Sequence, residues 1–219
     1  KIASGALALL GQVGALTLTE FGTTYYDNVM AVFVLSGLAI VVVARKTLRD
    51  GPPGRAALLS ALAGLITGMA MGLKLPEMPF CIGFAAALLA VGGSGRQIAI
   101  RLAAGAGGGL IGFAIFSAPW MLSMWHLTGN PIFPYFNDYW RSPLALAVSY
   151  RDLRFVPTHF WQQLLFPFLF TFDWHVAGDL GYQDIRAALV YLFWPLATIV
   201  WLLRRQSRDP LLEKHGTAI

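Results

Sequence analysis

The stretch SALAGLITGMAMGLKL, residues 60–75, is apolar almost throughout and repeats one spacing of small side chains. Small residues recur at every fourth position, and so on one face of a helix: Ser60, Gly64, Gly68 and Gly72. A later apolar run carries two similar pairs, Gly105 with Gly109 and Gly108 with Gly112. In lipid, such faces let two helix backbones approach closely. The pattern therefore predicts tight helix packing, within this fold or within a complex, and no catalytic role for these positions.

The composition predicts an integral membrane protein. The chain has 219 residues, of which 57% are hydrophobic and only 12% are charged, and its mean hydropathy is +0.62. A soluble domain usually carries about twice that charged fraction. The net charge of +5 does not indicate nucleic-acid binding, because the basic residues sit at the ends of apolar runs and form no solvated stripe. The single cysteine, Cys81, excludes a disulfide framework.

Six apolar runs are predicted to be membrane helices, at 2–19, 28–44, 56–75, 79–93, 102–124 and 186–203. The fourth is short for a straight crossing, so we expect it either to tilt with its flanks or to thin the bilayer locally. The polar connectors between them alternate between basic and weakly charged. If Lys1 and the basic connectors face the cytoplasm, that side holds 11 of the 16 Lys and Arg residues but 3 of the 11 Asp and Glu residues. Because the Lys/Arg bias sets orientation, the sequence predicts an all-α membrane protein with about six transmembrane helices and both termini in the cytoplasm.

The predicted topology divides the chain into three regions. Residues 1–125 are expected to hold the first five transmembrane helices with short loops, 126–185 one large extracytoplasmic loop, and 186–219 the last transmembrane helix and a cytoplasmic tail. Within the loop, WQQLLFPFLFTF (161–172) is apolar but too short to cross the bilayer and return. It predicts an interfacial or re-entrant helix, with Trp161 and Trp174 at the level of the lipid headgroups.

Three charged residues at the outer ends of the predicted spans invite a functional interpretation. Glu20 and Asp27 bracket the first outer loop, where they suit a general base or a metal ligand, or, for Asp27, the cap of the helix that follows. Lys74 ends the glycine-rich span three residues before Glu77. It either snorkels or pairs with Glu77, or it binds a phosphate as a compact, mobile charge. The residues alone leave these alternatives open.

The outer segment contributes two further patterns. TGNPIFPYFNDYW (128–140) ends a helix at Gly129 and Pro131 and then provides an aromatic shelf suited to the membrane surface. In FDWHVAGD (172–179), His175 follows Asp173 by two residues and precedes Asp179 by four, which fits either a metal cluster or an ordinary polar loop. The sequence contains none of the common zinc-protease, paired-cysteine, nucleophile-elbow or phosphate-loop motifs.

Three pieces of the chain resemble bacterial multi-spanning glycosyltransferases of the GT-C superfamily. They are YYDNVMAVFVLSGLAIVVVAR (25–45), GLITGMAMGLKLPEMPF (64–80), and PW with TGNPIFPYFN (119–137) followed by RSP. The resemblance implies a multi-pass protein of the bacterial inner membrane that acts on the extracytoplasmic face. It also implies the reaction, an inverting transfer of a sugar from a polyprenyl-phosphate donor to an acceptor hydroxyl. Membrane lipids and the lipid-linked donor are the implied partners.

The resemblance further implies roles for single residues. Asp27 matches the second outer-loop acid of these enzymes, and with Glu20 it is a candidate catalytic carboxylate. Lys74 and Arg141 are candidate contacts to the donor phosphate, whose charge basic residues neutralise. Four residues would belong to the loop that closes over the sugar and the acceptor: Asn130, Tyr135, Asn137 and Asp138. Some relatives also hold a divalent metal ion with outer-loop acids, so such an ion is the one cofactor implied.

The chain departs from the family pattern near its start. GT-C enzymes usually carry their principal catalytic Asp in the first outer loop, well upstream of the acid that Asp27 matches, whereas one predicted span precedes Asp27 here. We therefore expect either part of a larger enzyme or a truncated relative. The alternative hypothesis is a non-catalytic transmembrane subunit that packs against other subunits, lipids or pigments. A transporter is disfavoured, because no ionisable residue falls at mid-membrane.

Overall fold

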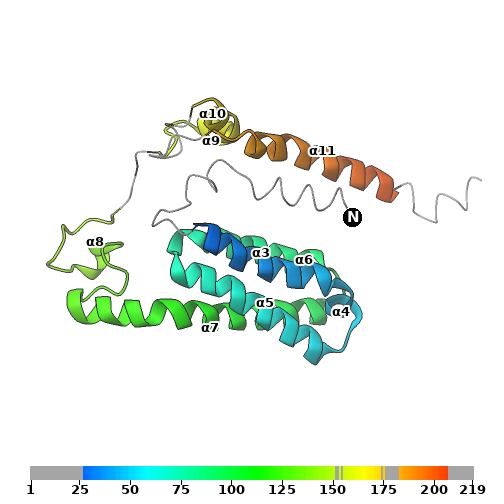
Figure 1. Ribbon diagram of the computed structural model, residues 1–219, viewed down its shortest axis with the longest axis horizontal. Coiled ribbons are helices and arrows are strands. Elements are labelled where there is room, and N and C mark those ends of the chain that lie inside the picture. The colour runs from blue at the N-terminus through cyan, green and yellow to red at the C-terminus, as the bar shows by residue number, and fades with distance from the viewer. Residues whose placement is uncertain (1–26, 151–152, 154, 174, 176–182, 207–219) are drawn as a thin grey trace, which may run out of the picture. The chain divides into compact units, whose positions relative to one another are not determined.

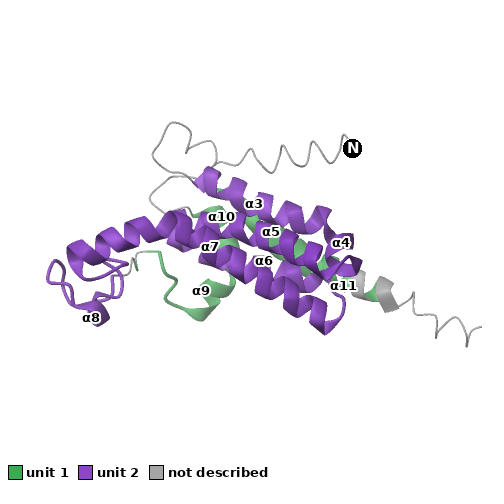
Figure 2. Cartoon of the chain, turned by 90° about the horizontal axis from the view of Figure 1, so that it is seen from below, with its two compact units in different colours: residues 1–19, 152–219 green, residues 20–151 purple. Residues whose placement is uncertain are grey.

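The computed structural model describes residues 27–150, 153, 155–173, 175 and 183–206. Within these residues all regular structure is helical and no strand is present, as the sequence predicts. The predicted first span, 2–19, lies outside the described residues, as do Glu20, Trp174 and Asp179. The chain forms two compact units: unit 2 comprises residues 20–151, and unit 1 comprises residues 1–19 and 152–219 (Figure 2).

Unit 2 is built on four long helices, with short helices at its two ends (Figure 1). In chain order its elements are α3 (Asp27–Val43), α4 (Arg45–Asp50), α5 (Pro53–Leu73), the 3-10 turn η1 (Leu75–Glu77), α6 (Met78–Ala90), α7 (Gly95–Thr128) and α8 (Asn137–Trp140). The four long helices coincide with predicted apolar runs. The short helices α4 and α8 were not predicted, because they fall in the polar connectors.

Helix α7 extends beyond the predicted run 102–124 at both ends, and local capping explains its limits. At its start the Ser94 hydroxyl accepts a hydrogen bond from the Gln97 backbone N–H, while the Gln97 side chain returns to the Ser94 backbone N–H. This capping box satisfies two N–H groups that the first turn leaves without helical partners. At its end Gly129 adopts a left-handed conformation, φ 72°, which terminates the helix.

The glycine faces of α5 and α7 pack directly against each other. A Cβ atom added at Gly64 would come within 2.0 Å of the Gly105 carbonyl oxygen, and one at Gly68 within 2.0 Å of the Gly109 carbonyl oxygen. From the other side, a Cβ at Gly108 would come within 2.0 Å of the Ala61 carbonyl oxygen. Residue numbers increase in the same direction along the two helices at these contacts, from Gly64 with Gly105 to Gly68 with Gly109, so α5 and α7 run parallel. Only glycine allows this approach of backbone to backbone, as the spacing of small residues predicts.

Helices α5 and α7 are long and apolar enough to cross a membrane. Only 39% and 22% of their most apolar stretches are buried inside the protein, whereas the core helix of a soluble protein is mostly buried. Large apolar side chains such as Leu58, Leu62, Leu110 and Ile111 instead point outward. The apolar helices α3 and α6 are shorter. Among the described residues, two helices thus have the dimensions of membrane spans, and the prediction of about six stays a prediction.

A buried arginine ties three helices together at the α4 end of unit 2. The Arg101 side chain, on α7, is 0% exposed. Its Nη1 donates to the Leu48 carbonyl oxygen at 2.6 Å, and its Nη2 to the Gly92 oxygen at 2.5 Å and the Leu88 oxygen at 3.5 Å. These carbonyls lie at or just beyond the C-terminal ends of α4 and α6, where helix dipoles favour a cation. The charge of Arg101 therefore stabilises two helix ends at once.

Unit 1 contains α9 (Phe160–Leu164), α10 (Phe166–Phe172) and α11 (Arg186–Gln206). The predicted single helix over 161–172 is two short helices, and Pro167 stands in the first turn of the second, where a missing N–H costs nothing. Phe168 of α10 contacts Tyr191 of α11 edge to face, with ring centroids 6.0 Å apart. The predicted span 186–203 coincides with α11, whose described apolar part is shorter than those of α5 and α7.

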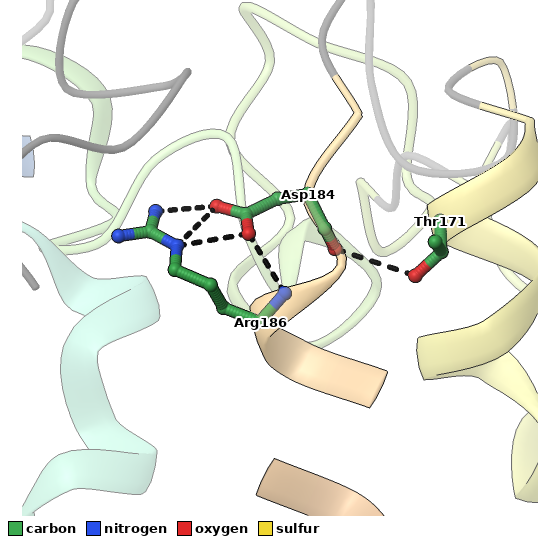
Figure 3. A network of polar contacts seen from close by, with 3 residues as sticks. All are labelled: Thr171, Asp184 and Arg186. Atoms are coloured by element: carbon green, nitrogen blue, oxygen red, sulfur yellow. Dashed lines mark hydrogen bonds and ion pairs between the residues drawn. The ribbon is translucent and has the colours of Figure 1, made fainter. Parts of the chain in front are cut away.

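A polar network joins α10 to the start of α11 (Figure 3). The Asp184 carboxylate accepts hydrogen bonds from the Arg186 side chain and, at 2.9 Å, from the Arg186 backbone N–H. The Thr171 hydroxyl donates to the Asp184 backbone carbonyl at 3.3 Å. The Arg186 guanidinium, followed by its backbone N–H, holds the pKa of Asp184 below its ordinary value.

We expect Gly108→Ala to destabilise the protein and Gly107→Ala to leave it unchanged or slightly stabilised. The new methyl at position 108 meets the backbone of Ala61, so α5 and α7 must separate, at a cost of about 1–3 kcal/mol. At position 107 nothing lies within 4 Å, and Ala gains about 0.5–1 kcal/mol of helix propensity. Thermal unfolding in detergent measures both variants. Equal midpoints would contradict the packing of this seam.

We expect Asp184 to stabilise unit 1 at neutral pH and to lose this effect in acid. Its pKa is lower in the folded than in the unfolded chain. The contribution is therefore fully present above the unfolded value of about 3.9 and disappears as the pH falls through the folded value. Thermal unfolding should place Asp184→Asn below the wild type at pH 7, with the gap closing below about pH 4. A gap that stays constant across this range would refute the assignment.

Candidate functional site

At the end of unit 2 opposite α4, helix α7 continues past the end of α5 (Figures 1 and 2). The two helices run parallel, and a Cβ at Gly72 would meet Phe113, so the last turn of α5 lies beside Phe113. At 1.5 Å per residue, the 21 residues of α5 span about 32 Å and the 34 residues of α7 about 51 Å. The part of α7 beyond Phe113 therefore projects past the end of α5.

A cavity of about 560 Å³ lies where α5 stops and α7 continues. Lys74 and Pro76 line it from the end of α5 and from η1. The projecting part of α7 contributes Ser117 and Trp120, and the loop after α7 contributes Tyr135. The lining thus combines one cation, aromatic surfaces and two side chains with hydroxyl groups, with apolar neighbours around them. Two residues proposed from sequence, Lys74 and Tyr135, meet here although 61 positions separate them in the chain.

Asp27 does not line this cavity itself but forms an ion pair with Lys74, which does. The Lys74 ammonium Nζ donates to the Asp27 carboxylate Oδ1, and the two side chains are 28% and 31% exposed. Asp27 begins α3, and its carboxylate stands in the first turn, where the helix dipole favours a negative charge. The sequence proposed Glu77 as the partner of Lys74, but the Glu77 side chain lies outside the described part of the structure. The pairing found joins two residues proposed separately, as catalytic acid and as phosphate contact.

Asn130 is buried and holds the turn that follows α7. Its side-chain oxygen accepts from the Ile132 backbone N–H at 3.0 Å, and its Nδ2 donates to the Tyr135 carbonyl oxygen at 2.9 Å. The Thr128 hydroxyl completes the turn by accepting from the Asn130 backbone N–H at 3.1 Å. With 0% exposure, the Asn130 amide faces the loop and not a substrate. Its place in the structure is that of a residue that positions Tyr135.

Asn137 likewise holds the backbone of a loop, in this case the segment that follows α8. It is 0% exposed, and its Nδ2 lies within 3.0–3.1 Å of three backbone carbonyl oxygens, those of Ser142, Ala145 and Leu146. Its Oδ1 accepts from the Ser142 backbone N–H at 2.8 Å. These bonds fold the chain after α8 back onto the start of that helix. They also stabilise left-handed backbone conformations on either side, at Phe136 and Arg141, which are unfavourable for residues with side chains.

Two further proposed residues, Asp138 and Arg141, are exposed and lie outside the cavity lining. Asp138 and Arg141 belong to α8 and its C-terminal cap, and their side chains are accessible. The aromatic side chains of this region contact each other edge to face: Trp125 with Trp140 at 5.4 Å, and Tyr135 with Tyr150 at 5.8 Å between centroids. Aromatic rings of this segment thus form edge-to-face pairs, and their place at a membrane surface stays a prediction. Glu20 lies outside the described residues.

Sequence reasoning missed two of the side chains that line the cavity, Ser117 and Trp120. Both lie on the face of α7 that continues the glycine seam past Phe113. Ser117 follows Phe113 by four residues and Trp120 follows Ser117 by three, which keeps all three on one helix face. That periodicity was available in the sequence. What it did not reveal was that α5 stops beside Phe113, so that the continuation of the seam lines the cavity and does not pack against α5.

The described residues hold no group of three or more His, Cys, Asp or Glu side chains that could bind a metal ion. Two of the residues considered for such a site do form a pair: His175 Nδ1 lies 2.9 Å from Asp173 Oδ1. Hydrogen bonds from the side chain and backbone of His175 hold the pKa of Asp173 below its ordinary value. The third member of that predicted cluster, Asp179, falls outside the described residues.

No protein-family model matches the chain, and no curated protein or solved structure shows significant similarity to it.

We expect Asn137→Asp to open the loop after α8 without unfolding the helices. A carboxylate cannot donate to the carbonyls of Ser142, Ala145 and Leu146, so buried acceptors lose their partner, at a cost of about 2 kcal/mol or more. Hydrogen–deuterium exchange should increase over residues 137–146 and stay unchanged in α5. The exposed neighbour variant Asp138→Asn is the control and should change stability by less than about 0.5 kcal/mol. Unaltered exchange in Asn137→Asp would show that the amide does not hold the loop.

Proposed function

We propose that the chain is a GT-C-like membrane glycosyltransferase, or part of one, that takes a sugar from a lipid-phosphate-linked donor. One observation carries this proposal: Lys74, ion-paired with Asp27, lines the same cavity as Trp120 and Tyr135. Lysine suits a phosphate group, and aromatic rings provide apolar faces on which a sugar ring packs. A carboxylate beside them is the group that removes the proton of an acceptor hydroxyl.

In the proposed reaction the donor phosphate binds Lys74 and displaces Asp27 from the ion pair. The acceptor hydroxyl oxygen then attacks the anomeric carbon, and its proton passes to the Asp27 carboxylate. The bond between the anomeric carbon and the phosphate oxygen breaks, and the prenyl phosphate leaves with the bonding electrons. Lys74 stabilises the charge that develops on this phosphate, and attack from the opposite face inverts the configuration. Asn130 and Asn137 act by positioning the loop that carries Tyr135.

The proposed location is the bacterial inner membrane, with the cavity on the extracytoplasmic side and the α4 end in the cytoplasm. The basic residues of unit 2 support this orientation, because Arg45, Lys46 and Arg49 of α4 lie at the end opposite the cavity. A multi-pass topology with both termini in the cytoplasm belongs to the same proposal. The outward-facing apolar side chains of α5 and α7 support membrane insertion.

A non-catalytic transmembrane subunit is the second candidate function. The ion pair itself favours it, because a carboxylate held by a lysine is already neutralised and can serve simply to join α3 to the end of α5. The two functions differ in what Lys74 and Asp27 do when a lipid phosphate is present. In an enzyme the phosphate replaces Asp27 at Lys74, whereas in a structural subunit the pair stays closed.

The test uses the protein isolated from its native membrane and reconstituted in nanodiscs, with farnesyl phosphate as the probe. We expect Lys74→Met to weaken farnesyl phosphate binding at least about tenfold, because a charged hydrogen bond is lost. Asp27→Asn should keep or strengthen this binding, since the competing carboxylate is gone. With native membrane lipids as donor source, Asp27→Asn should lower sugar transfer at least about a hundredfold. Lys74→Arg, which keeps the charge, is the matched control and should retain binding.

Three results would decide against the enzyme. Unchanged farnesyl phosphate affinity in Lys74→Met would show that Lys74 does not bind the phosphate. Unchanged transfer in Asp27→Asn would show that Asp27 is not the base. Absence of transfer by the native protein, with intact binding, would favour the structural subunit. The intact mass of the isolated protein accompanies these assays, because a mass above 23.8 kDa with sequence before Lys1 would provide the upstream loop expected of the family.

A further inference from the structure

The end of unit 2 that carries α4 presents a cluster of exposed basic side chains. Five residues from three helices contribute to it: Arg45, Lys46, Arg49, Arg55 and Arg96. They gather because α3 ends at this end of the bundle while α5 and α7 begin there (Figures 1 and 2). The carboxylate described among them is Asp50, which lies 3.7 Å from Arg49 in an exposed pair. We call these five residues the basic rim.

The buried charge beneath the basic rim adds to its positive potential. Arg101 bonds to backbone carbonyls of Leu48, Leu88 and Gly92, and its Nε has no hydrogen-bond partner. Those carbonyls stabilise the guanidinium by their dipoles but leave its net charge in place. Six cations and one carboxylate therefore occupy this end among the described residues. A surface of that kind attracts anions, and short-range pairing within the protein does not cancel it.

The surroundings of the basic rim indicate which anion it fits. Val42 and Val43, three and two residues before Arg45, are exposed, and so is Leu58, one turn after Arg55 on α5. Long basic side chains at the edge of an outward apolar surface reach from hydrocarbon to the level of lipid phosphates. Proteins that bind single-stranded nucleic acid commonly stack its bases on aromatic side chains between such cations. No exposed Trp, Tyr or Phe occurs among residues 42–58 or 91–101. The juxtaposition of cations and apolar surface fits a membrane surface.

We propose that the basic rim binds the headgroups of anionic phospholipids and gathers these lipids around this end of the bundle. The inference rests on the membrane location proposed above and not on glycosyl transfer. Each basic side chain near an anionic surface strengthens association by about fivefold, so five of them give a strong preference over zwitterionic lipid. The preference falls with ionic strength, because the Debye length at physiological salt is about 8 Å.

The test measures lipid selectivity directly in the reconstituted full chain. Spin-labelled phosphatidylglycerol and phosphatidylcholine are compared, at low and high salt, for the fraction immobilised by the protein. A variant with glutamine at all five rim positions should lose the preference for phosphatidylglycerol by about tenfold or more. A second variant with Lys in place of the four Arg residues keeps the charge and should keep the preference. Arg141→Gln, an exposed cation at the other end of unit 2, is the further control.

Four outcomes overturn the proposal. Equal immobilisation of the two lipids by the wild-type protein would refute the proposed lipid preference. This measurement needs no variant, so it decides the question even if the glutamine variant fails to fold. A preference that survives in the glutamine variant would place the lipid site elsewhere. Loss of the preference in millimolar inorganic phosphate at constant ionic strength would assign the rim to a soluble anion. Extraction of the protein from membranes by alkaline carbonate would refute the membrane location itself, whereas failed sugar transfer would leave the lipid preference intact.

Discussion

The direct contact of the α5 and α7 backbones is the constraint on which the rest of unit 2 depends. Carbonyl oxygens of one helix lie where a Cβ atom of the other would stand, at Gly64, Gly68, Gly108 and Gly112. Hydrophobic burial cannot drive this contact in a lipid environment, because the outward faces are equally apolar. Close van der Waals packing of the two backbones can, and it fixes their axial register as well as their separation.

That register decides where a cavity forms. Because α5 and α7 are parallel and locked turn by turn, the residue of α7 opposite the end of α5 is set as Phe113. Beyond that point α5 no longer packs against the continuing face of α7, and Ser117 and Trp120 line the cavity from this face. Lys74 lines the same cavity because it is the residue at which α5 ends. A slip of one turn in the glycine seam would place Lys74 opposite a different turn of α7, away from Ser117 and Trp120.

Buried polar groups complete the two ends of the unit in different ways. At one end the Asn130 and Asn137 amides replace missing secondary structure, since each bonds to backbone groups of an irregular loop. At the other end Arg101 supplies donors to the final carbonyls of two helices. Both devices satisfy backbone groups that water does not reach. The proposed chemistry and the proposed lipid surface therefore occupy opposite, separately stabilised ends of one bundle.

The positions of the helices could be predicted from sequence because apolar runs, capping residues and glycine stops are local signals. The run 28–44 corresponds to α3 and the run 79–93 to α6, each within a few residues at the ends, and the small-residue spacing correctly predicted a tight helix seam. Local signals also singled out Lys74, Asp27 and Tyr135 as candidate site residues. They failed for α4 and for the break between α9 and α10, where short helices depend on surrounding contacts more than on propensity.

The sequence by itself determined an apolar, all-helical chain with glycine faces on two helices and charges placed at helix ends. The tertiary structure alone decided that Asp27 pairs with Lys74, that Tyr135 shares a cavity with Lys74, and that Asn130, Asn137 and Arg101 are buried. The physical reason is that the residues of one helix face follow from a spacing of three or four positions along the chain. The contact partner of a side chain instead depends on which other helix lies beside it in the folded protein. That pairing follows from the register of α5 against α7, which arises only when the two backbones meet.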